Sequence, residues 1–589
     1  MRHIIGGFGV VVLALACPAL AFGEMAPVAD RLTQQNALFE EYYQTELKNS
    51  PERATSVGDY RYNDKLGQYS LAEIARRHAE ADAFLAKLIA IPTDGMGDTD
   101  LLSHRLLETQ IEREDVNFSL KNYEMPVNQQ NGVHTRLADL VNGMPFDSVP
   151  HYQDYISRLH QIPRVLDQVT EVMRQGLKDG LMPPKLVLEK LPGQCDGVIA
   201  ANPFLLPTKK FPAEFSDADK KRLTDEITKA VNDDVFPAYK KFAEFLRTDY
   251  DPKGRPEISI ETLPDGKRRY AEAVKMMTTT NVPPAEIHEI GLKEVERITA
   301  EMTKLAQAQG KKDLASFREA INNDPKWKPK SEQQIVDDFA KYIHQMEPKL
   351  PELFGLLPKS PVTVEPIPDF AKAAATHYVN GTPDGKRPGR VVVAVSDPTK
   401  RSLVDDEAVA YHEGVPGHHM QISIAQTLPD LPKFRLHGGY SSYAEGWALY
   451  AEELGKEIGF YQDPVSDYGR LNSELFRAVR LVVDTGIHDK NWSREKVIDY
   501  MHANDVNDTV AQSETDRYIA WPGQALAYKM GQLTIRKLRE EAKTQLGSKF
   551  DIKAFHDEIL NGGAMPLDLL QERVRGWIKS QASAPAKSG

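Results

Sequence analysis

Apolar residues recur at three- and four-residue intervals over most of the chain, with charged residues between them. This spacing predicts amphipathic helices over residues 26–47, 71–89, 152–179, 216–248 and 284–309. Apolar residues three and four positions apart share one face of a helix, so each segment can bury that face against a neighbour. The pattern therefore predicts a mainly α protein.

Strand-like segments are few, and the clearest is GRVVVAVSDP, residues 389–398. It is a β-branched run bounded by turn residues, and it lies shortly before a histidine-rich segment. We therefore predict a small β element next to the candidate site, and we expect Arg390 to Val395 to pair with an extended peptide through a free edge. Segments rich in Pro, Gly and Asp predict loops near residues 91–98, 191–211 and 250–264.

The length and composition fit a large globular protein. With 589 residues, the chain favours two lobes or one large elongated helical body. A net charge of -12, without a long Lys/Arg run, argues against a nucleic-acid partner. We divide the chain into an N-terminal helical lobe, 22–270, a C-terminal helical lobe with most of the candidate chemistry, 271–579, and a tail, 580–589, that is predicted to be disordered.

The N-terminus has the pattern of an export signal. A short basic start, an apolar stretch and a small-residue cleavage site after Ala21 predict a signal peptide over residues 1–21. The apolar stretch is too short for a membrane span, so we expect a periplasmic or secreted protein without an integral span. Lipidation at Cys17 is the less favoured alternative, because Ala14 stands where a large aliphatic residue is usual.

The segment HEGVPGHHMQ, residues 412–421, begins like the zinc signature HExxH. In that signature two histidines lie one helical turn apart and reach a single zinc ion. Here Pro416 stands where the second histidine is expected. His418 and His419 follow about 9 to 10.5 Å further along an unbroken helix, at about 1.5 Å per residue. That separation is too long for two zinc–nitrogen bonds of about 2 Å.

Pro416 and Gly417 are the residues most able to prevent a straight helix here. Proline lacks the N–H that would bond to the carbonyl of His412, and glycine adopts backbone angles that other residues avoid. If the pair is treated as a two-residue insertion, the remaining letters again read HExxH. We predict that His412 and His418 bind Zn²⁺. His419 is the alternative second ligand and otherwise a candidate for substrate binding.

A third ligand is expected from a following helix. The segment YAEGWALYAEEL has helix-forming composition and carries Glu445 near its start. Three protein ligands leave zinc with an open position, which is the catalytic arrangement. Glu413 would then be the general base that takes a proton from water as it attacks a carbonyl. Glu452, on nearly the same helical face as Glu445, is predicted to be a solvated or supporting carboxylate, while Trp447 and Tyr450 are predicted core residues.

Several longer blocks resemble one family. These blocks are GDYRYNDKLGQYS, DGKRPGRVVVAVSDP, YHEGVPGHHMQ, SSYAEGWALYAEELG, RLVVDTGIH and RYIAWPGQALAYKMGQLTIRKLRE. They are similar to the domain-of-unknown-function 885 family, which is placed among zincin-like metallopeptidases. The resemblance implies a mostly helical fold like the thimet oligopeptidase and angiotensin-converting-enzyme group, with a zinc site at the floor of a deep central cleft. It also implies peptide-bond hydrolysis, and the interrupted HExxH belongs to this family.

The last of these blocks carries candidates for the remaining tasks. Tyr528 is the preferred donor to a developing oxyanion, by analogy with related zincins that use a tyrosine late in the chain. Arg517 and Tyr518 are candidates for substrate binding. The Arg517 guanidinium can bind a carboxylate of the substrate. A packed helix tyrosine and a surface ion pair are the competing interpretations of Tyr528 and Arg517.

Two further histidines, His488 and His437, are candidate site residues. Asp484 and His488 are spaced to face the same side of a helix, where they could orient a zinc ligand or the substrate, or simply form a structural hydrogen bond. His437 lies close in sequence to Glu445 and is a candidate cleft-lining residue.

These observations predict an exported zinc metallopeptidase that hydrolyses peptides, as a carboxypeptidase or an oligopeptidase. One alternative is an exported peptide-binding protein whose zinc site is structural or vestigial. The other is a zinc hydrolase of non-peptide esters or amides. The metal ligands indicate that a water molecule is activated, but they say less about which acyl compound it attacks.

Overall fold

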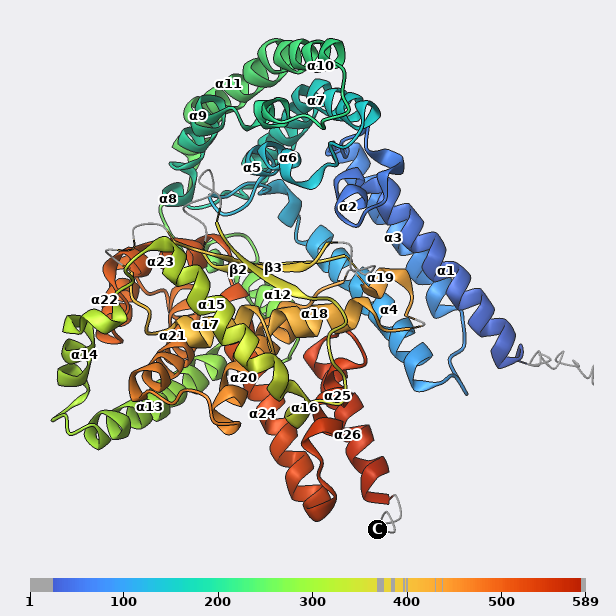
Figure 1. Ribbon diagram of the computed structural model, residues 1–589. Helices are drawn as coiled ribbons and strands as arrows, with labels where there is room; N and C mark the ends of the chain where they lie inside the picture. Colours follow the sequence, from blue (N-terminus) through green and yellow to red (C-terminus); the bar gives the residue numbers. More distant parts are fainter. Residues whose placement is uncertain are drawn as a thin grey trace, which may run out of the picture.

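The computed structural model describes residues 25–367, 375–382, 387–395, 398, 401–429, 431–436 and 438–583. The predicted signal peptide with Cys17, the end of the predicted tail and His437 lie outside the described residues. Within them the fold is mainly α with one small sheet, as the sequence predicts (Figure 1). No helix in the described part of the chain is both long enough and apolar enough to cross a membrane.

The helices of the first half are α1 Val28–Asn49, α2 Pro51–Ser56, α3 Leu71–Ile89, α4 Asp98–Ser119, α5 Val133–Ala138, α6 Leu140–Gly143, α7 Val149–Asp179, α8 Lys185–Leu188, α9 Leu191–Ala201, α10 Asp217–Ala230, α11 Phe236–Phe245 and α12 Gly266–Thr278. Those of the second half are α13 Pro284–Ala308, α14 Leu314–Asn323, α15 Glu332–Met346, α16 Leu350–Leu353, α17 Asp406–Glu413, α18 His418–Gln426, α19 Lys433–Leu436, α20 Ser441–Glu457, α21 Pro464–His488, α22 Arg494–Ala503, α23 Asp508–Ala520, α24 Ala527–Leu546, α25 Ile552–Leu560 and α26 Leu567–Ser583. The strands are β1 Val362–Pro366, β2 His377–Val379 and β3 Gly389–Val393.

The long predicted helices are confirmed as α1, α3, α7 and α13. The segment predicted as one helix over residues 216–248 is helical throughout, but a π-helical turn, Val231–Val235, separates α10 from α11. Pro237 lies at the start of α11 and has no N–H for the α-helical bond to the preceding turn, so a wider turn can form there.

The prediction of a loop over residues 191–211 is wrong. Residues Leu191–Ala201 form helix α9, and Pro203–Lys209 form a short 3₁₀ helix. The proline and glycines of LPGQCDG suggested a loop, but Leu191 and Cys195 are fully buried against neighbouring helices. Packing of this apolar face therefore outweighs the weak helix propensity of its residues.

The sheet has the strand order β1-β3-β2, with β3 in the middle. Strand β3 pairs in parallel with β1 and antiparallel with β2, so both of its edges are occupied. The expectation that Arg390 to Val395 binds a peptide through a free edge is therefore wrong. Strands β1 and β2 are short and partly exposed, which is why only the apolar β3 is evident in the sequence.

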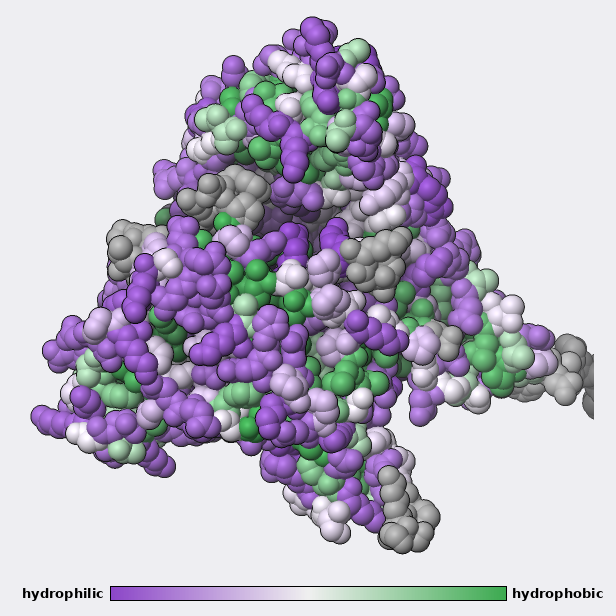
Figure 2. Space-filling view, in the orientation of Figure 1, coloured by the Kyte–Doolittle hydropathy of each residue, from purple (hydrophilic) through white to green (hydrophobic). Residues whose placement is uncertain are grey.

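Two large hydrophobic cores organise the helices. One joins α1, α3 and α4 to the helices of the second half, and the other gathers buried residues between Leu66 and Tyr250. The second core holds together α5, α7 and α9–α11, which form the upper part of the molecule in Figure 1. Figure 2 shows that this face is hollowed between that upper part and the helices below it. The domain boundary near residue 270 stays a prediction.

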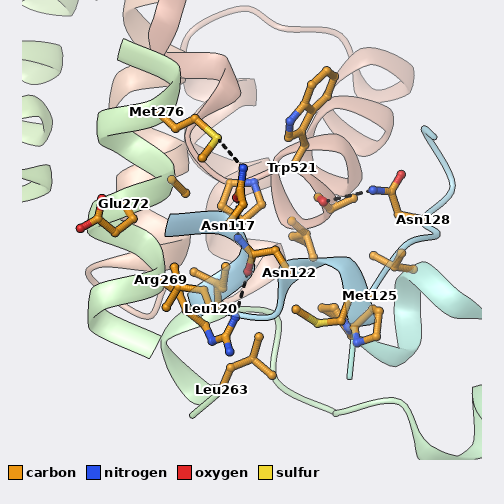
Figure 3. Close-up of a pocket in the computed structure, with 18 of the residues that line it drawn as sticks. Asn117, Leu120, Asn122, Met125, Asn128, Leu263, Arg269, Glu272, Met276 and Trp521 are labelled. Carbon is orange, nitrogen blue, oxygen red and sulfur yellow. Dashed lines mark hydrogen bonds between the residues drawn. The ribbon is translucent and has the colours of Figure 1, made fainter. Parts of the chain in front are cut away.

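A cavity of about 290 Å³ lies where the N-terminal half meets the segment after α23. Figure 3 shows its mostly apolar lining, with Met276 and Trp521 on one side and Leu120 and Met125 on the other. Hydrogen bonds cross the same junction: the Asn128 amide donates to the Ala520 carbonyl at 3.5 Å, and the Gln129 amide donates to the Asp516 carbonyl at 2.7 Å. These contacts fix the segment that carries the candidate residues Arg517 and Tyr518.

Candidate metal centre

The interrupted signature forms two helices with a tight turn between them. Helix α17 ends at Glu413 and α18 begins at His418, so the prediction that Pro416 and Gly417 prevent a straight helix is confirmed. A Cβ on Gly417 would lie 2.0 Å from the carbonyl oxygen of His412, which leaves no room for a side chain. The Trp447 indole N–H donates to the Pro416 carbonyl at 2.9 Å and holds the turn against α20.

This turn brings the three predicted ligands together. The Nε2 atoms of His412 and His418 lie 3.5 Å and 3.4 Å from Oε2 of Glu445. One donor atom from each of the three residues lies within 4.8 Å of the other two. In a tetrahedral zinc site with bonds of about 2.0 to 2.2 Å, neighbouring donor atoms are about 3.3 to 3.6 Å apart. The separations of 3.5 Å and 3.4 Å therefore fit one ion, and the ligand set of two imidazoles and a carboxylate suits zinc.

Glu452 supports His412 from behind. Its Oε1 lies 2.8 Å from Nδ1 of His412, and both residues are buried. This bond fixes the ring so that the other nitrogen, Nε2, points toward Glu445. Burial disfavours a charged imidazole, but the hydrogen bonds to Glu445 and Glu452 raise the pKa of His412 to about 9. A metal ion at Nε2 would take the place of that proton.

Replacing Glu452 by Gln is expected to weaken metal binding about 10- to 100-fold, because a carboxylate behind a ligand histidine orients the ring and increases its basicity. Competition against a chromophoric chelator would measure the affinity. Glu457→Gln is the matched control, since Glu457 is on the same helix but pairs with Arg539 on the surface. An affinity equal to that of the control would show that Glu452 does not support the site.

His419 points elsewhere, although it follows His418 directly. Its Nδ1 lies 3.1 Å from the hydroxyl of Tyr378 on β2, and its Nε2 lies 3.1 Å from the carbonyl oxygen of Ser360. The side chain is 1% exposed, and burial lowers its pKa to about 4. Both ring nitrogens of His419 are occupied, so the structure presents His418 and not His419 to Glu445.

Tyr528, the candidate oxyanion donor, lies in the first turn of α24, and its pKa responds to the charge of Glu445. Burial, and next the charge of Glu445, raise the pKa of its hydroxyl, while Arg480 and Arg517 oppose the rise. The hydroxyl therefore keeps its proton at neutral pH and can donate a hydrogen bond. The guanidinium of Arg480 lies 4.7 Å from the centre of the Tyr528 ring.

The helices α20 and α24 touch through two glycines. A Cβ on Gly446 would lie 2.4 Å from Cα of Gly531, and one on Gly531 would lie 2.0 Å from the carbonyl oxygen of Ser442. No side chain fits between the helices at this point. The close approach sets the position of Glu445, next to Gly446, relative to Tyr528, one turn before Gly531.

Arg517 and Tyr518 belong to an internal ion-pair cluster. Arg517 donates to both carboxylate oxygens of Glu514, at 3.0 and 2.8 Å, and Tyr518 donates to Glu514 at 2.6 Å. Arg480 adds a second cation, with Nη2 3.0 Å from Glu514. Sequence spacing does not point to Arg480, because its partner Glu514 lies on another helix. The ion-pair interpretation accounts for the contacts of Arg517.

His488 and Asp484 lie in the interior. Both are fully buried; Nδ1 of His488 accepts from the Ile260 N–H at 3.1 Å, and Nε2 donates to the Tyr518 carbonyl at 3.0 Å. Burial lowers the pKa of His488 to about 3, so the ring is neutral. Asp484 accepts from the Tyr270 hydroxyl at 2.7 Å. These bonds fit the structural interpretation of the pair.

The fold of nearly the whole chain is shared with proteins of solved structure. The crystal structure of a putative lipoprotein from Colwellia psychrerythraea is similar with a TM-score of 0.88 and 30% identity, over 93% of this chain and 100% of that chain. The structure of a putative lipoprotein of unknown function from Shewanella oneidensis has the same fold, with a TM-score of 0.70 and 19% identity over 92% of this chain and 99% of that chain. None of the curated proteins matches. Residues 51–574 match the bacterial proteins of unknown function called DUF885, and the chain belongs to this family.

Proposed function

We propose that this protein is an exported, zincin-like metallopeptidase that hydrolyses peptides, as a carboxypeptidase or an oligopeptidase. The observation that carries the proposal is the convergence of His412, His418 and Glu445 on one point, within 4.8 Å, with Glu413 directly after the first ligand. Export is supported by the export-signal pattern at the N-terminus and by the lipoprotein descriptions of the two similar structures.

In this proposal the three ligands hold Zn²⁺, which when bound polarises a substrate carbonyl and makes water a better nucleophile. Glu413, at the end of α17, takes the proton of the attacking water and later delivers it to the leaving amine. The Tyr528 hydroxyl donates a hydrogen bond to the oxygen of the former carbonyl as negative charge develops there. Glu452 keeps the His412 ring in its orientation throughout.

The sheet next to the site supports a peptide as the substrate. Strand β2 lies at the edge of the sheet, and among the described residues no strand pairs with its outer side. Its Tyr378 contacts His419, the residue after the ligand His418. An extended peptide could therefore add to this edge through backbone hydrogen bonds, which recognise peptides regardless of their side chains.

Removal of the metal is expected to stop hydrolysis. The mature protein is incubated with a mixed peptide pool, with and without a chelator, and the pool is analysed by mass spectrometry. Chelator-sensitive loss of terminal residues indicates a carboxypeptidase, and internal cuts indicate an oligopeptidase. Restoration of cleavage by added Zn²⁺ is the control for damage by the chelator.

An unchanged pool, with metal measured in the protein, would refute the peptidase. Binding of peptides without cleavage would then favour the peptide-binding protein. Turnover of chromogenic esters, but of no peptide, would favour a hydrolase of non-peptide substrates.

A further inference from the structure

A cavity of about 580 Å³ is lined in part by the two helices that carry His418 and Glu445. Gln421, which lies one turn after His418 on α18, and Ala444, which directly precedes Glu445 on α20, both line it. Its other walls come from α2, from the chain after β2, from β3 and from α19. The cavity therefore shares helices α18 and α20 with the candidate metal centre.

The walls of this cavity are positively charged. Arg53, Arg387, Arg390 and Arg435 line it, and none of its described lining residues is Asp or Glu. This composition contrasts with the whole chain, whose net charge is -12. Arg53 lies 3.8 Å from Glu46 and Arg390 lies 2.6 Å from Glu365, but neither carboxylate lines the cavity, and an excess of positive charge at its walls favours an anionic ligand. We call this cavity the arginine pocket.

Arg435 is a buried arginine of this pocket, and its contacts favour an anionic ligand. It is 6% exposed, and it donates only to neutral groups, the Ser103 hydroxyl at 2.8 Å and the Gly562 carbonyl. Within the described residues no carboxylate pairs with it, and its Nε is buried without a hydrogen-bond partner. A buried guanidinium without an anion is costly, because burial removes its hydration. An anion in the arginine pocket would compensate for that cost.

Two other lining groups are also unsatisfied. Arg390 pairs with Glu365 through Nη1 at 2.6 Å, but its buried Nε has no partner within the described part of the chain. Gln421 is 3% exposed, and its buried Oε1 likewise has no partner there. The orientation of an amide can be reversed, so Gln421 can offer its N–H groups to an oxyanion. Within the described residues, the pocket is therefore lined by a polar group without a partner on β3 and by another on α18.

We propose that the arginine pocket binds a carboxylate of the substrate, so that the enzyme selects peptides that carry a carboxylate on this side of the scissile bond. This proposal rests on the proposed peptidase function and adds its substrate class. Arginine suits the task, since its planar fork binds both oxygens of a carboxylate. The carboxylate has two sources, the C-terminus of the peptide or an acidic side chain.

The test compares three versions of one peptide: with a free C-terminus and an internal Glu, with an amidated C-terminus, and with Gln in place of Glu. Wild-type kcat/KM is expected to fall about 10- to 100-fold when the bound carboxylate is removed, as for a charge-assisted bidentate contact. A fall on amidation identifies the terminal carboxylate, and a fall on Glu replacement identifies the side chain. Equal kcat/KM for all three peptides overturns the proposal.

The variants are Arg435→Gln and Arg387→Gln. Arg387 is exposed, so its variant tests the pocket even if loss of the buried Arg435 prevents folding. Each is expected to reduce the ratio of kcat/KM between the peptide with both carboxylates and the version that lacks the bound carboxylate. Arg76→Gln, which removes an exposed arginine from α3, is the matched control. An undiminished preference in both pocket variants also overturns the proposal.

Measurements of peptide binding distinguish this proposal from the proposed peptidase function. Calorimetry with the Glu413→Gln protein measures the affinity for the same three peptides without turnover. One outcome is that the wild type cleaves no peptide, but removal of one carboxylate weakens binding and this effect depends on Arg435 or Arg387. That outcome supports the proposed carboxylate site and refutes the proposed peptidase function. Equal binding of all three peptides refutes the pocket, whatever the wild type cleaves.

Discussion

Replacing Glu413 by Gln is expected to reduce peptide hydrolysis by about 10²- to 10⁴-fold, the usual contribution of a general base. The amide has nearly the same shape as the carboxylate but cannot accept a proton from water. Glu413 is not one of the three converging ligands, so the metal content should stay at the wild-type level. The measurement is kcat/KM on a cleaved peptide, together with metal analysis of the same preparation.

The matched control for this variant is Glu540→Gln, which removes an exposed carboxylate of α24 that pairs with Lys543. It should retain wild-type activity. Near-wild-type activity of Glu413→Gln would show that another group accepts the proton. Loss of metal together with activity would instead make Glu413 part of the metal site.

Replacing His418 by Ala is expected to remove the metal and the activity together, because only two of the three converging ligands remain. His419→Ala is the paired variant and should have the opposite phenotype. It should keep the metal and lose about 1 to 3 kcal/mol of stability, since the Ser360 carbonyl and the Tyr378 hydroxyl lose their hydrogen bonds to its ring. Metal analysis and urea unfolding separate the two variants.

A His418→Ala protein that retains stoichiometric metal would refute the ligand assignment. Metal loss in His419→Ala with unchanged unfolding would transfer the role to His419. In His418→Cys, a soft ligand replaces the imidazole, so partial recovery of metal binding would support a direct bond at this position.

Much of the helical architecture can be predicted from the sequence, because amphipathic spacing alone marks α3, α13 and most of α1 and α7. The small sheet is predicted only through β3, since its apolar residues reflect burial on both faces. Strands β1 and β2 are defined by pairing with β3 and have little pattern of their own. The same limit applies to α9, whose helix depends on tertiary packing.

The candidate metal centre follows from local spacing, because His412, Glu413, His418 and Glu445 lie on two segments with recognisable patterns. The choice between His418 and His419 required the structure, since it depends on contacts with Tyr378 and Ser360. The arginine pocket was not predicted at all. Its four arginines are scattered between Arg53 and Arg435, and only the fold brings them to one cavity.

The contact between Gly446 and Gly531 limits how this molecule can move. Because backbone meets backbone there, α20 and α24 cannot slide past each other without collision of the adjoining side chains, so Glu445 and Tyr528 travel as one rigid body. The arginine pocket shares α20 with this pair of helices through Ala444, but its other walls include helix α2, the sheet and helix α19, which lie outside the pair. Movements of α2, the sheet or α19 that admit a substrate can therefore change the shape of the pocket while the distance between Glu445 and Tyr528 stays constant.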